Sequence, residues 1–149
     1  FVGLGKNIGE SQSLSHVHLV DVKLAKVAWQ ALSDGIQQSV ALKCLRINKC
    51  DLKIPSLDSL VPGIVQNKSL QIIDLSDNKI PDNCAGLLLK VVSGQGERLD
   101  EIVWSFGLRG ELPSNLHEEG MRVYNVSGNE LSLQMAKGLE KFLQNNIYL

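Results

Sequence analysis

The most regular feature of the chain is an apolar pattern that begins at Leu14, Leu42 and Leu70, 28 residues apart, and recurs at Met121. In the run from Leu70 to Ile80, apolar residues occupy positions one, four, six and eleven, and Asn78 occupies position nine. Three other segments fill the same five positions, in the order Leu14, Val17, Leu19, Val22, Leu24, then Leu42, Leu45, Ile47, Cys50, Leu52, then Met121, Tyr124, Val126, Asn129, Leu131. A fixed period of this length indicates a repeat architecture, in which neighbouring units bury one continuous core.

Within each unit the apolar period changes from two to helical spacing. Positions four and six alternate with polar residues, which predicts a short strand with one buried face. The residues that follow are spaced as on one face of a helix. These helical sets are Ala28, Trp29, Leu32 and Ile36, then Leu57, Leu60 and Ile64, then Cys84, Ala85, Leu88 and Val92, and finally Met135, Ala136, Leu139 and Leu143. Leu4 and Ile8 align with the first set, so residues 1–11 are predicted to be a further helix.

The spacing L-x-x-L-x-L-x-x-N-x-L in four segments resembles the leucine-rich repeat family. The 28-residue period and the Asn or Cys at position nine are similar to its ribonuclease-inhibitor-like subclass. The resemblance implies an α/β fold, a leucine-rich-repeat solenoid (horseshoe) with a parallel inner sheet and outer helices. It also implies a ladder of hydrogen bonds from Asn78 and Asn129, with Cys50 as a weaker donor; Val22 cannot take part. We expect residues 1–149 to form one leucine-rich repeat domain of about five repeats, with both ends cut within a repeat.

One unit departs from the period. Leu99, Ile102 and Trp104 set the register of a further strand, but only 22 residues separate Leu99 from Met121. The stretch Ser93–Glu97 predicts a loose loop, and Leu108–Pro113 resembles the turn of plant-type leucine-rich repeats. We expect an irregular connection over Leu108–Gly120. Trp29 and Trp104 both fall at buried positions of the pattern, so both are assigned to the core.

Charge and composition narrow the class of function. Fifteen Lys and Arg against 16 Asp and Glu give a net charge of -1, and 44% of residues are hydrophobic. This composition predicts a folded domain with no basic stripe for nucleic acid or an anionic membrane. Three cysteines without paired spacing favour a reducing, cytoplasmic setting over a secreted or cell-surface one. Sequons at Asn67 and Asn125 leave glycosylation open.

No motif carries a recognisable chemistry. Gly3-Leu-Gly5-Lys-Asn-Ile-Gly9 misses a phosphate-binding glycine pattern by one residue and falls on a predicted helix. His16, His18 and Cys44 share one predicted sheet face, but a fourth zinc ligand is missing. His117 beside Glu118 and Glu119 is interpreted as a solvated charge cluster. We therefore expect no catalytic residue, no cofactor and no metal, and the chain is predicted not to be an enzyme.

The predicted concave strand face is the remaining candidate surface. It mixes exposed apolar residues with isolated charges, as protein recognition surfaces do. The candidate binding residues are His16, His18, Arg46, Asn48, Ile72, Asp74, Ser76, Val103, Val123 and Asn125. The alternative for the two charged residues is a simple lateral pair between Arg46 and Asp74.

The functional hypothesis is a non-enzymatic scaffold that binds a protein partner, with no nucleic acid or membrane partner. The partner's identity and the oligomeric state are left open. Two alternatives stay beside it: the ligand-sensing repeat region of an innate immune receptor, and part of a ciliary, centrosomal or cytoskeletal scaffold. A regulatory module within an enzyme is a further alternative.

Overall fold

The structure, a computed structural model, describes residues 2–108 and 123–144. Its elements alternate between helix and strand from the first to the last. In chain order they are α1 (Val2–Glu10), β1 (His16–Val20), α2 (Lys26–Gln38), β2 (Cys44–Asn48), α3 (Ile54–Gln66), β3 (Ile72–Asp74), the 3₁₀ helix η1 (Asp82–Cys84), α4 (Ala85–Leu108), β4 (Val123–Asn125) and α6 (Leu133–Gln144). The predicted α/β class is confirmed.

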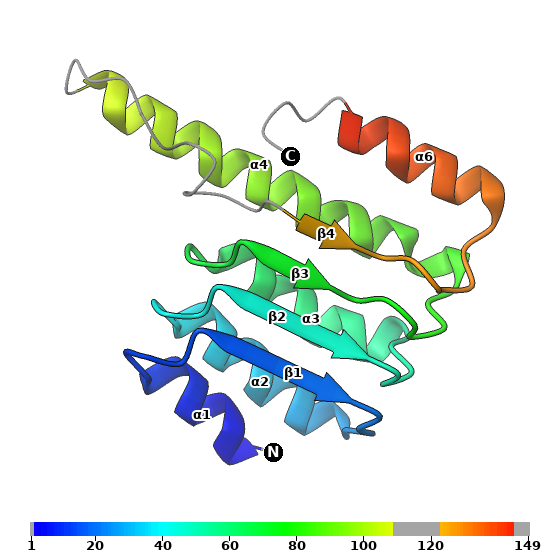
Figure 1. The fold of residues 1–149 in the computed structure, drawn as a ribbon, viewed down its shortest axis with the longest axis horizontal. Coiled ribbons are helices and arrows are strands. Elements are labelled where there is room, and N and C mark those ends of the chain that lie inside the picture. Colours follow the sequence, from blue (N-terminus) through cyan, green and yellow to red (C-terminus); the bar gives the residue numbers. More distant parts are fainter. Residues whose placement is uncertain (1, 109–122, 145–149) are drawn as a thin grey trace.

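The four strands form one parallel sheet in sequence order, β1-β2-β3-β4 (Figure 1). The register follows the repeat, because His16 pairs with Cys44, Cys44 with Ile72, and Ile72 with Val123. Residues at the same position of the apolar pattern therefore lie side by side across the sheet. The strands predicted from positions four and six are confirmed for these four segments.

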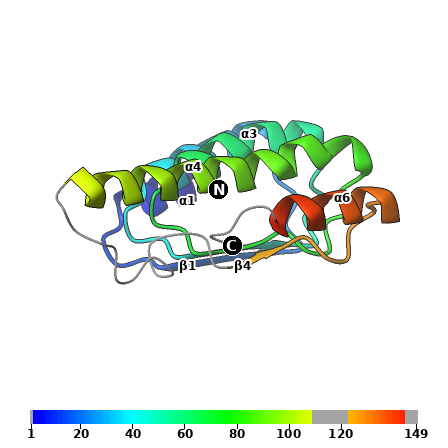
Figure 2. The ribbon, with the colours of Figure 1, turned by 90° about the horizontal axis from the view of Figure 1, so that it is seen from above.

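The helices α1 to α4 lie on one side of the sheet (Figure 2). Alternate strand residues point toward them and are buried, as the burial pattern of β1 shows: Val17 and Leu19 are inside, and their neighbours are outside. Leu45, Ile47, Ile73 and Leu75 continue this inner row, all with no exposed surface. The core is thus a single layer between strands and helices, as the change of apolar period predicts.

Small residues let the first three helices approach closely. A Cβ atom added to Gly35 of α2 would lie 1.9 Å from the carbonyl oxygen of Gly5 in α1. A Cβ atom on Gly63 of α3 would lie 2.3 Å from the carbonyl oxygen of Ser33 in α2. Any larger side chain would force the backbones apart, so these glycines are required by helix packing.

Side chains at position nine link neighbouring units. The backbone N–H of Cys50 donates to Asn78 Oδ1 at 2.8 Å, and the N–H of Asn78 donates to Asn129 Oδ1 at 2.9 Å. Asn78 Nδ2 donates in turn to the carbonyl oxygens of Ile47 and Leu75, at 2.6 and 2.9 Å. This asparagine ladder satisfies backbone groups that leave the strands, and Asn78 is fully buried within it.

The predicted strand around Leu99 and Ile102 is wrong. Residues 85–108 form one continuous helix, α4, which runs through the predicted loop at Ser93–Glu97 as well. The apolar residues of this segment fit both periods, since Leu99, Ile102, Val103 and Phe106 also follow helical spacing. Gly94 and Gly96 in that stretch each lower helix propensity by roughly 1 kcal/mol, and the surrounding helix formers outweigh that cost. Among the described residues the sheet therefore has four strands, and a regular five-unit horseshoe is not found.

The assignment of Trp104 to the core is also wrong. Trp29 is 2% exposed, as predicted, whereas Trp104 lies on α4 with 69% of its surface exposed. Its predicted burial depended on the strand register that the helix replaces. Leu108 is the last residue of α4. The rest of the predicted irregular connection, together with His117, Glu118 and Glu119, lies outside the described residues.

Candidate functional site

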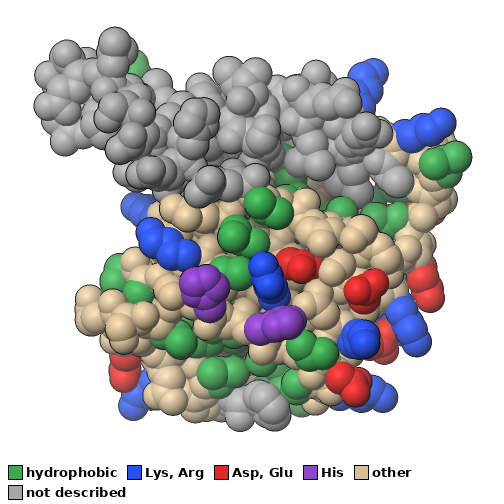
Figure 3. All heavy atoms as spheres, viewed as in Figure 1, with side chains coloured by type: hydrophobic (Ala, Val, Ile, Leu, Met, Phe, Trp, Pro, Cys, Tyr) green, Lys and Arg blue, Asp and Glu red, His purple; other side chains and the backbone are tan. Residues whose placement is uncertain are grey.

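The face of the sheet opposite α1 to α4 brings most of the predicted binding residues together. His18, Arg46, Asp74 and Asn125 form one row across the four strands in direct register. Both histidines and Arg46 are exposed. Figure 3 looks onto this face and shows the two histidines, basic and acidic side chains, and apolar side chains gathered on it. The candidate site is called the open sheet face below.

A chain of hydrogen bonds crosses three strands on the open sheet face. His18 Nε2 lies 2.7 Å from Asn48 Oδ1, and Asn48 Nδ2 donates to Asp74 Oδ1 at 3.2 Å and to Ser76 Oγ at 3.0 Å. Because the amide nitrogen of Asn48 faces Asp74, its oxygen faces His18, so the imidazole is the donor at Nε2. These four side chains are held as one polar network before any partner arrives.

Asp74 is the anionic end of this network. Its Oδ1 accepts from the backbone N–H of Ser76 at 2.9 Å and from Ser76 Oγ at 2.6 Å, in addition to Asn48. Partial burial opposes ionisation, but these hydrogen bonds and the charge of Arg46 outweigh it and lower the pKa of Asp74 below its ordinary value. The carboxylate is therefore ionised at neutral pH.

The alternative that Arg46 and Asp74 simply form an ion pair does not hold. Among the described residues the ion pair within 4.0 Å joins Lys53 to Asp51, both largely exposed. Asp74 Oδ1 accepts hydrogen bonds from Ser76 and Asn48 instead. Arg46 lies beside Asp74 in register but is not bonded to it.

Apolar residues complete the open sheet face toward β4. Ile72 is half-buried, and its register neighbour Val123 is 48% exposed. At Asn125 the local geometry of Asp74 is repeated, since Ser127 donates to Asn125 Oδ1 through its N–H at 3.0 Å and its Oγ at 2.7 Å. Val103 was predicted to be part of this surface as a strand residue. That placement is wrong, because Val103 lies within α4.

The motifs set aside in the sequence have structural explanations. Cys44 is 3% exposed beside His16, and the described residues contain no group of three His, Cys, Asp or Glu that could hold a metal. Gly5 lies in α1 against Ala31 of α2, so its role is close helix packing. In the described part of the chain no helix is long and apolar enough to cross a membrane.

The sequon at Asn67 is inside the protein. Asn67 has no exposed surface, and its Nδ2 donates to the carbonyl oxygens of Ile36 and Ser39 at 2.6 and 3.2 Å. A glycan on this nitrogen would break both hydrogen bonds and has no space in this fold. The second sequon residue, Asn125, is partly buried on the open sheet face.

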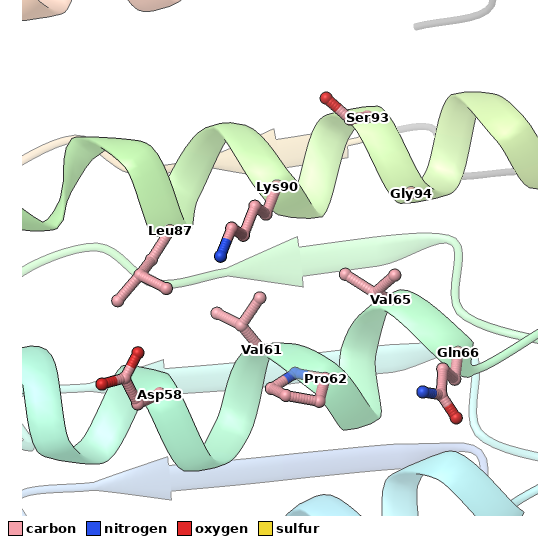
Figure 4. A pocket seen from close by; sticks show the side chains of 9 residues that line it. All are labelled: Asp58, Val61, Pro62, Val65, Gln66, Leu87, Lys90, Ser93 and Gly94. Carbon is pink, nitrogen blue, oxygen red and sulfur yellow. The ribbon is translucent and has the colours of Figure 1, made fainter.

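The helical side carries a groove that the sequence pattern did not reveal. A cavity of about 430 Å³ lies between α3 and α4, with Val61, Val65 and Leu87 forming part of its apolar wall (Figure 4). Asp58 of α3 and Lys90 of α4 line it as well. Its width depends on how far α4 stands from α3, and the repeat spacing says nothing about that distance.

A smaller hollow of about 330 Å³ lies beyond the strands, where the chain turns toward the helices. Alternating acids and lysines line it, among them Asp21, Lys49 and Asp77. These three residues have left-handed backbone angles, with φ of 54°, 55° and 59°. The sharp turns follow from this conformation, which aspartate tolerates better than most residues and which Lys49 adopts as well.

Comparison with known proteins places the fold. The sequence matches no protein-family model and no curated protein. Solved structures do match, and two of them cover nearly the whole chain. Leiomodin-1 Actin-Binding Site 2 covers 96% of this chain and 87% of its own, with a TM-score of 0.58 and 8% identity. The tropomodulin C-terminal domain of Caenorhabditis elegans covers 98% of this chain and 93% of its own, with a TM-score of 0.59 and 13% identity.

These matches correct the family resemblance drawn from the repeat. The predicted membership of the ribonuclease-inhibitor-like leucine-rich repeats is wrong, because the structural neighbours are the leiomodin and tropomodulin domains. The long α4 is the physical reason, since it replaces the strand that a regular array requires. What the sequence pattern identified correctly is the parallel sheet backed by helices.

Proposed function

We propose that this chain is a non-enzymatic protein-binding module of the cytoskeleton, with actin as the first candidate partner. The observation that carries the proposal is the shared fold over 96% of the chain with a domain that is an actin-binding site of leiomodin-1. Among the hypotheses drawn from the sequence, this supports the cytoskeletal scaffold. The innate immune receptor and the enzyme-linked regulatory module stay untested predictions.

The open sheet face is the proposed contact surface. It combines a preorganised polar network at His18, Asn48 and Asp74 with exposed apolar surface at Val123. Apolar anchors surrounded by orienting polar groups are typical of protein interfaces. The setting that fits such a partner is the cytoplasm, in agreement with the three free cysteines.

Co-sedimentation with filamentous actin tests the proposal, together with a gel-shift assay on monomeric actin. We expect the folded chain to bind one of the two forms. Val123→Asp on the open sheet face should weaken that binding. Val27→Asp is the matched control, because Val27 is an exposed valine on α2, on the helical side.

The variants separate two ways of failing. If the wild-type chain binds neither form of actin, actin is not its partner. If Val123→Asp and Val27→Asp bind actin as well as the wild type does, the partner uses another surface, and the groove between α3 and α4 becomes the next to test.

A further inference from the structure

Arg46 is the cation at the centre of the open sheet face. It lies directly between His18 of β1 and Asp74 of β3 in the register of the sheet. Its side chain is exposed and forms no hydrogen bond or ion pair with any residue that the structure describes. A guanidinium group offers five N–H donors in a planar fork that matches a carboxylate.

Hydrogen bonds hold one carboxylate oxygen of Asp74, the register neighbour of Arg46 on β3. Asp74 Oδ1 accepts three hydrogen bonds, from the backbone N–H and Oγ of Ser76 and from Asn48 Nδ2. These donors lie toward the carboxyl end of the strands and hold the Asp74 carboxylate there. The donors of Arg46 have no partner among the described residues and are available to a ligand.

Two imidazoles border Arg46 on its β1 side. His18 is its direct cross-strand neighbour, and His16 is two residues earlier on the same exposed face. Hydrogen bonds already orient both rings: His18 Nε2 meets Asn48 Oδ1, and His16 Nδ1 meets Ser15 Oγ at 2.7 Å. The second ring nitrogen of each histidine has no hydrogen-bond partner among the described residues, and each imidazole offers an edge that can contact a ligand beside Arg46.

An apolar surface begins one strand away. Ile72 is diagonal to Arg46, because it pairs with Cys44, and Val123 follows on β4. Parallel strands lie about 4.8 Å apart, so the guanidinium and Val123 are separated by roughly 10 Å across the sheet. A short peptide segment spans that distance with two or three residues.

We propose that the open sheet face binds an acidic segment of a partner protein. Arg46 donates to a Glu or Asp carboxylate beside His16 and His18, and an aliphatic side chain of the same segment covers Ile72 and Val123. This inference rests on the proposed function, protein binding at the open sheet face, and names the chemistry of the partner.

Selection from a random dodecapeptide display library tests the inference without assuming actin. The folded chain serves as the bait, and fluorescence anisotropy measures the dissociation constant of each enriched peptide. We expect the enriched peptides to share an acidic residue two to four positions from an aliphatic one. An enriched set without excess acidic residues, or no enrichment at all, overturns the inference.

Variants then assign the contact. Arg46→Gln should weaken binding of an enriched peptide at least tenfold, and Arg46→Lys should restore only part of it, because lysine lacks the planar fork. Lys26→Gln on α2 is the matched control and should leave binding unchanged. Replacing the peptide's acidic residue with its amide should cost the wild type tenfold and cost Arg46→Gln little. Equal losses in both proteins would show that Arg46 is not the carboxylate's partner.

The outcomes also separate this inference from the actin proposal. If acidic peptides bind and actin does not, the open sheet face serves another protein and the inference stands. If actin binds and Arg46→Gln does not weaken that binding, the proposed function stands and the acidic-segment inference fails.

Discussion

The first three strand–helix units and the carboxyl-terminal part of the chain connect neighbouring strands of the sheet in different ways. From α1 to β3, strands follow one another at 28 residues, and helices α2 and α3 have 13 residues each. After β3, a helix of 24 residues replaces the next strand, and the two ladder asparagines that link β3 to β4 are 51 residues apart. The sheet nevertheless continues in order and in register.

This difference indicates that hydrogen bonds at the strand ends influence which strands pair more than the length of the connection between them does. The N–H of Asn78 donates to Asn129 Oδ1, and the N–H of Cys50 donates to Asn78 Oδ1 at nearly the same distance. The entropy of closing a loop grows only slowly with its length. A satisfied asparagine ladder and a shared core therefore outweigh a connection that is almost twice as long.

The helices pack less closely where the long helix α4 follows α3. Between α1, α2 and α3, glycines bring backbones into direct contact, as at Gly35 and Gly63. Between α3 and α4 a close approach is made at Gly94, whose added Cβ would lie 2.4 Å from Val65 Cγ1. The same two residues line the groove of about 430 Å³ that lies between these helices. The amino-terminal helices form the tighter layer.

The largest predicted effect tests that tight layer. Gly35→Ala should lower the free energy of unfolding by about 3 kcal/mol, because the new methyl group meets the backbone of Gly5. Gly138→Ala in α6 has nothing within 4 Å and should raise the free energy of unfolding by up to about 1 kcal/mol. Urea unfolding followed by circular dichroism measures both. A gain in stability for Gly35→Ala would contradict the close packing of α1 and α2.

The asparagine ladder offers the second comparison. Asn78→Ala should cost about 2–3 kcal/mol, because it leaves the N–H of Cys50 and the carbonyl of Ile47 without partners in the core. Asn129→Ala should cost about 1 kcal/mol, since its hydrogen bonds are partly exposed. Urea midpoints rank the two. Equal losses would show that the outer end of the ladder is as constrained as its centre.

A single tyrosine joins β4 to the long helix. Tyr124 donates through its hydroxyl to the carbonyl oxygen of Leu88 in α4 at 3.0 Å. Tyr124→Phe should lower the free energy of unfolding by about 1 kcal/mol. The variant should leave β1 to β3 intact, and hydrogen exchange would show protection lost first in β4. Loss spread evenly over the sheet would contradict a local role.

The same tyrosine predicts a dependence on alkaline pH. Burial raises the pKa of Tyr124 above its ordinary value. An unfolded tyrosine loses its proton near pH 10, while the folded one keeps it. Deprotonation therefore stabilises the unfolded state alone, and the free energy of unfolding falls as pH rises above about 10. Urea midpoints between pH 8 and 11 should fall more in the wild type than in Tyr124→Phe. Identical slopes would contradict this source of the dependence.

The smallest predicted effect concerns the pKa of Asp74 and follows from comparing two equivalent turns. Asp74 and Asn125 accept the same pair of hydrogen bonds, from Ser76 and Ser127. Only Asp74 can ionise. Because its pKa is lower in the folded state, the ionised carboxylate stabilises the fold at pH values above the unfolded pKa, and this stabilisation is lost as pH falls through the folded pKa. Carboxyl NMR titration should place the midpoint of Asp74 below that of an exposed Asp. Ser76→Ala should raise it, and an unchanged midpoint would show that Ser76 is not the cause.

Much of the candidate site was predictable, because strand alternation fixes which residues share a face. His16, His18, Arg46, Asp74 and Asn125 were placed on one surface from the repeat alone, and the register confirms that placement. Whether they bind a partner stays a prediction. The network from His18 to Ser76 was not predictable, since side-chain rotamers and the orientation of an amide depend on distances of a few tenths of an ångström.

Val103 and Trp104 show where the pattern is ambiguous. Their segment carries apolar residues that satisfy a strand register and a helical face equally well. Local propensity is a weak guide in such a case, and the tertiary context decides. The groove between α3 and α4 follows from that decision, which explains why no residue pattern announced it.

The sequence by itself determined the parallel order of β1 to β3, the inner row of apolar residues and the ladder positions, because burial period and spacing are properties of the chain. Only the tertiary structure decided that residues 85–108 form one helix, which places β4 beside β3, and that Arg46 has no ionic partner among the described residues. Both outcomes depend on competition between alternatives of similar local energy. Contacts made elsewhere in the fold settle that competition, and the chain's local pattern carries no record of them.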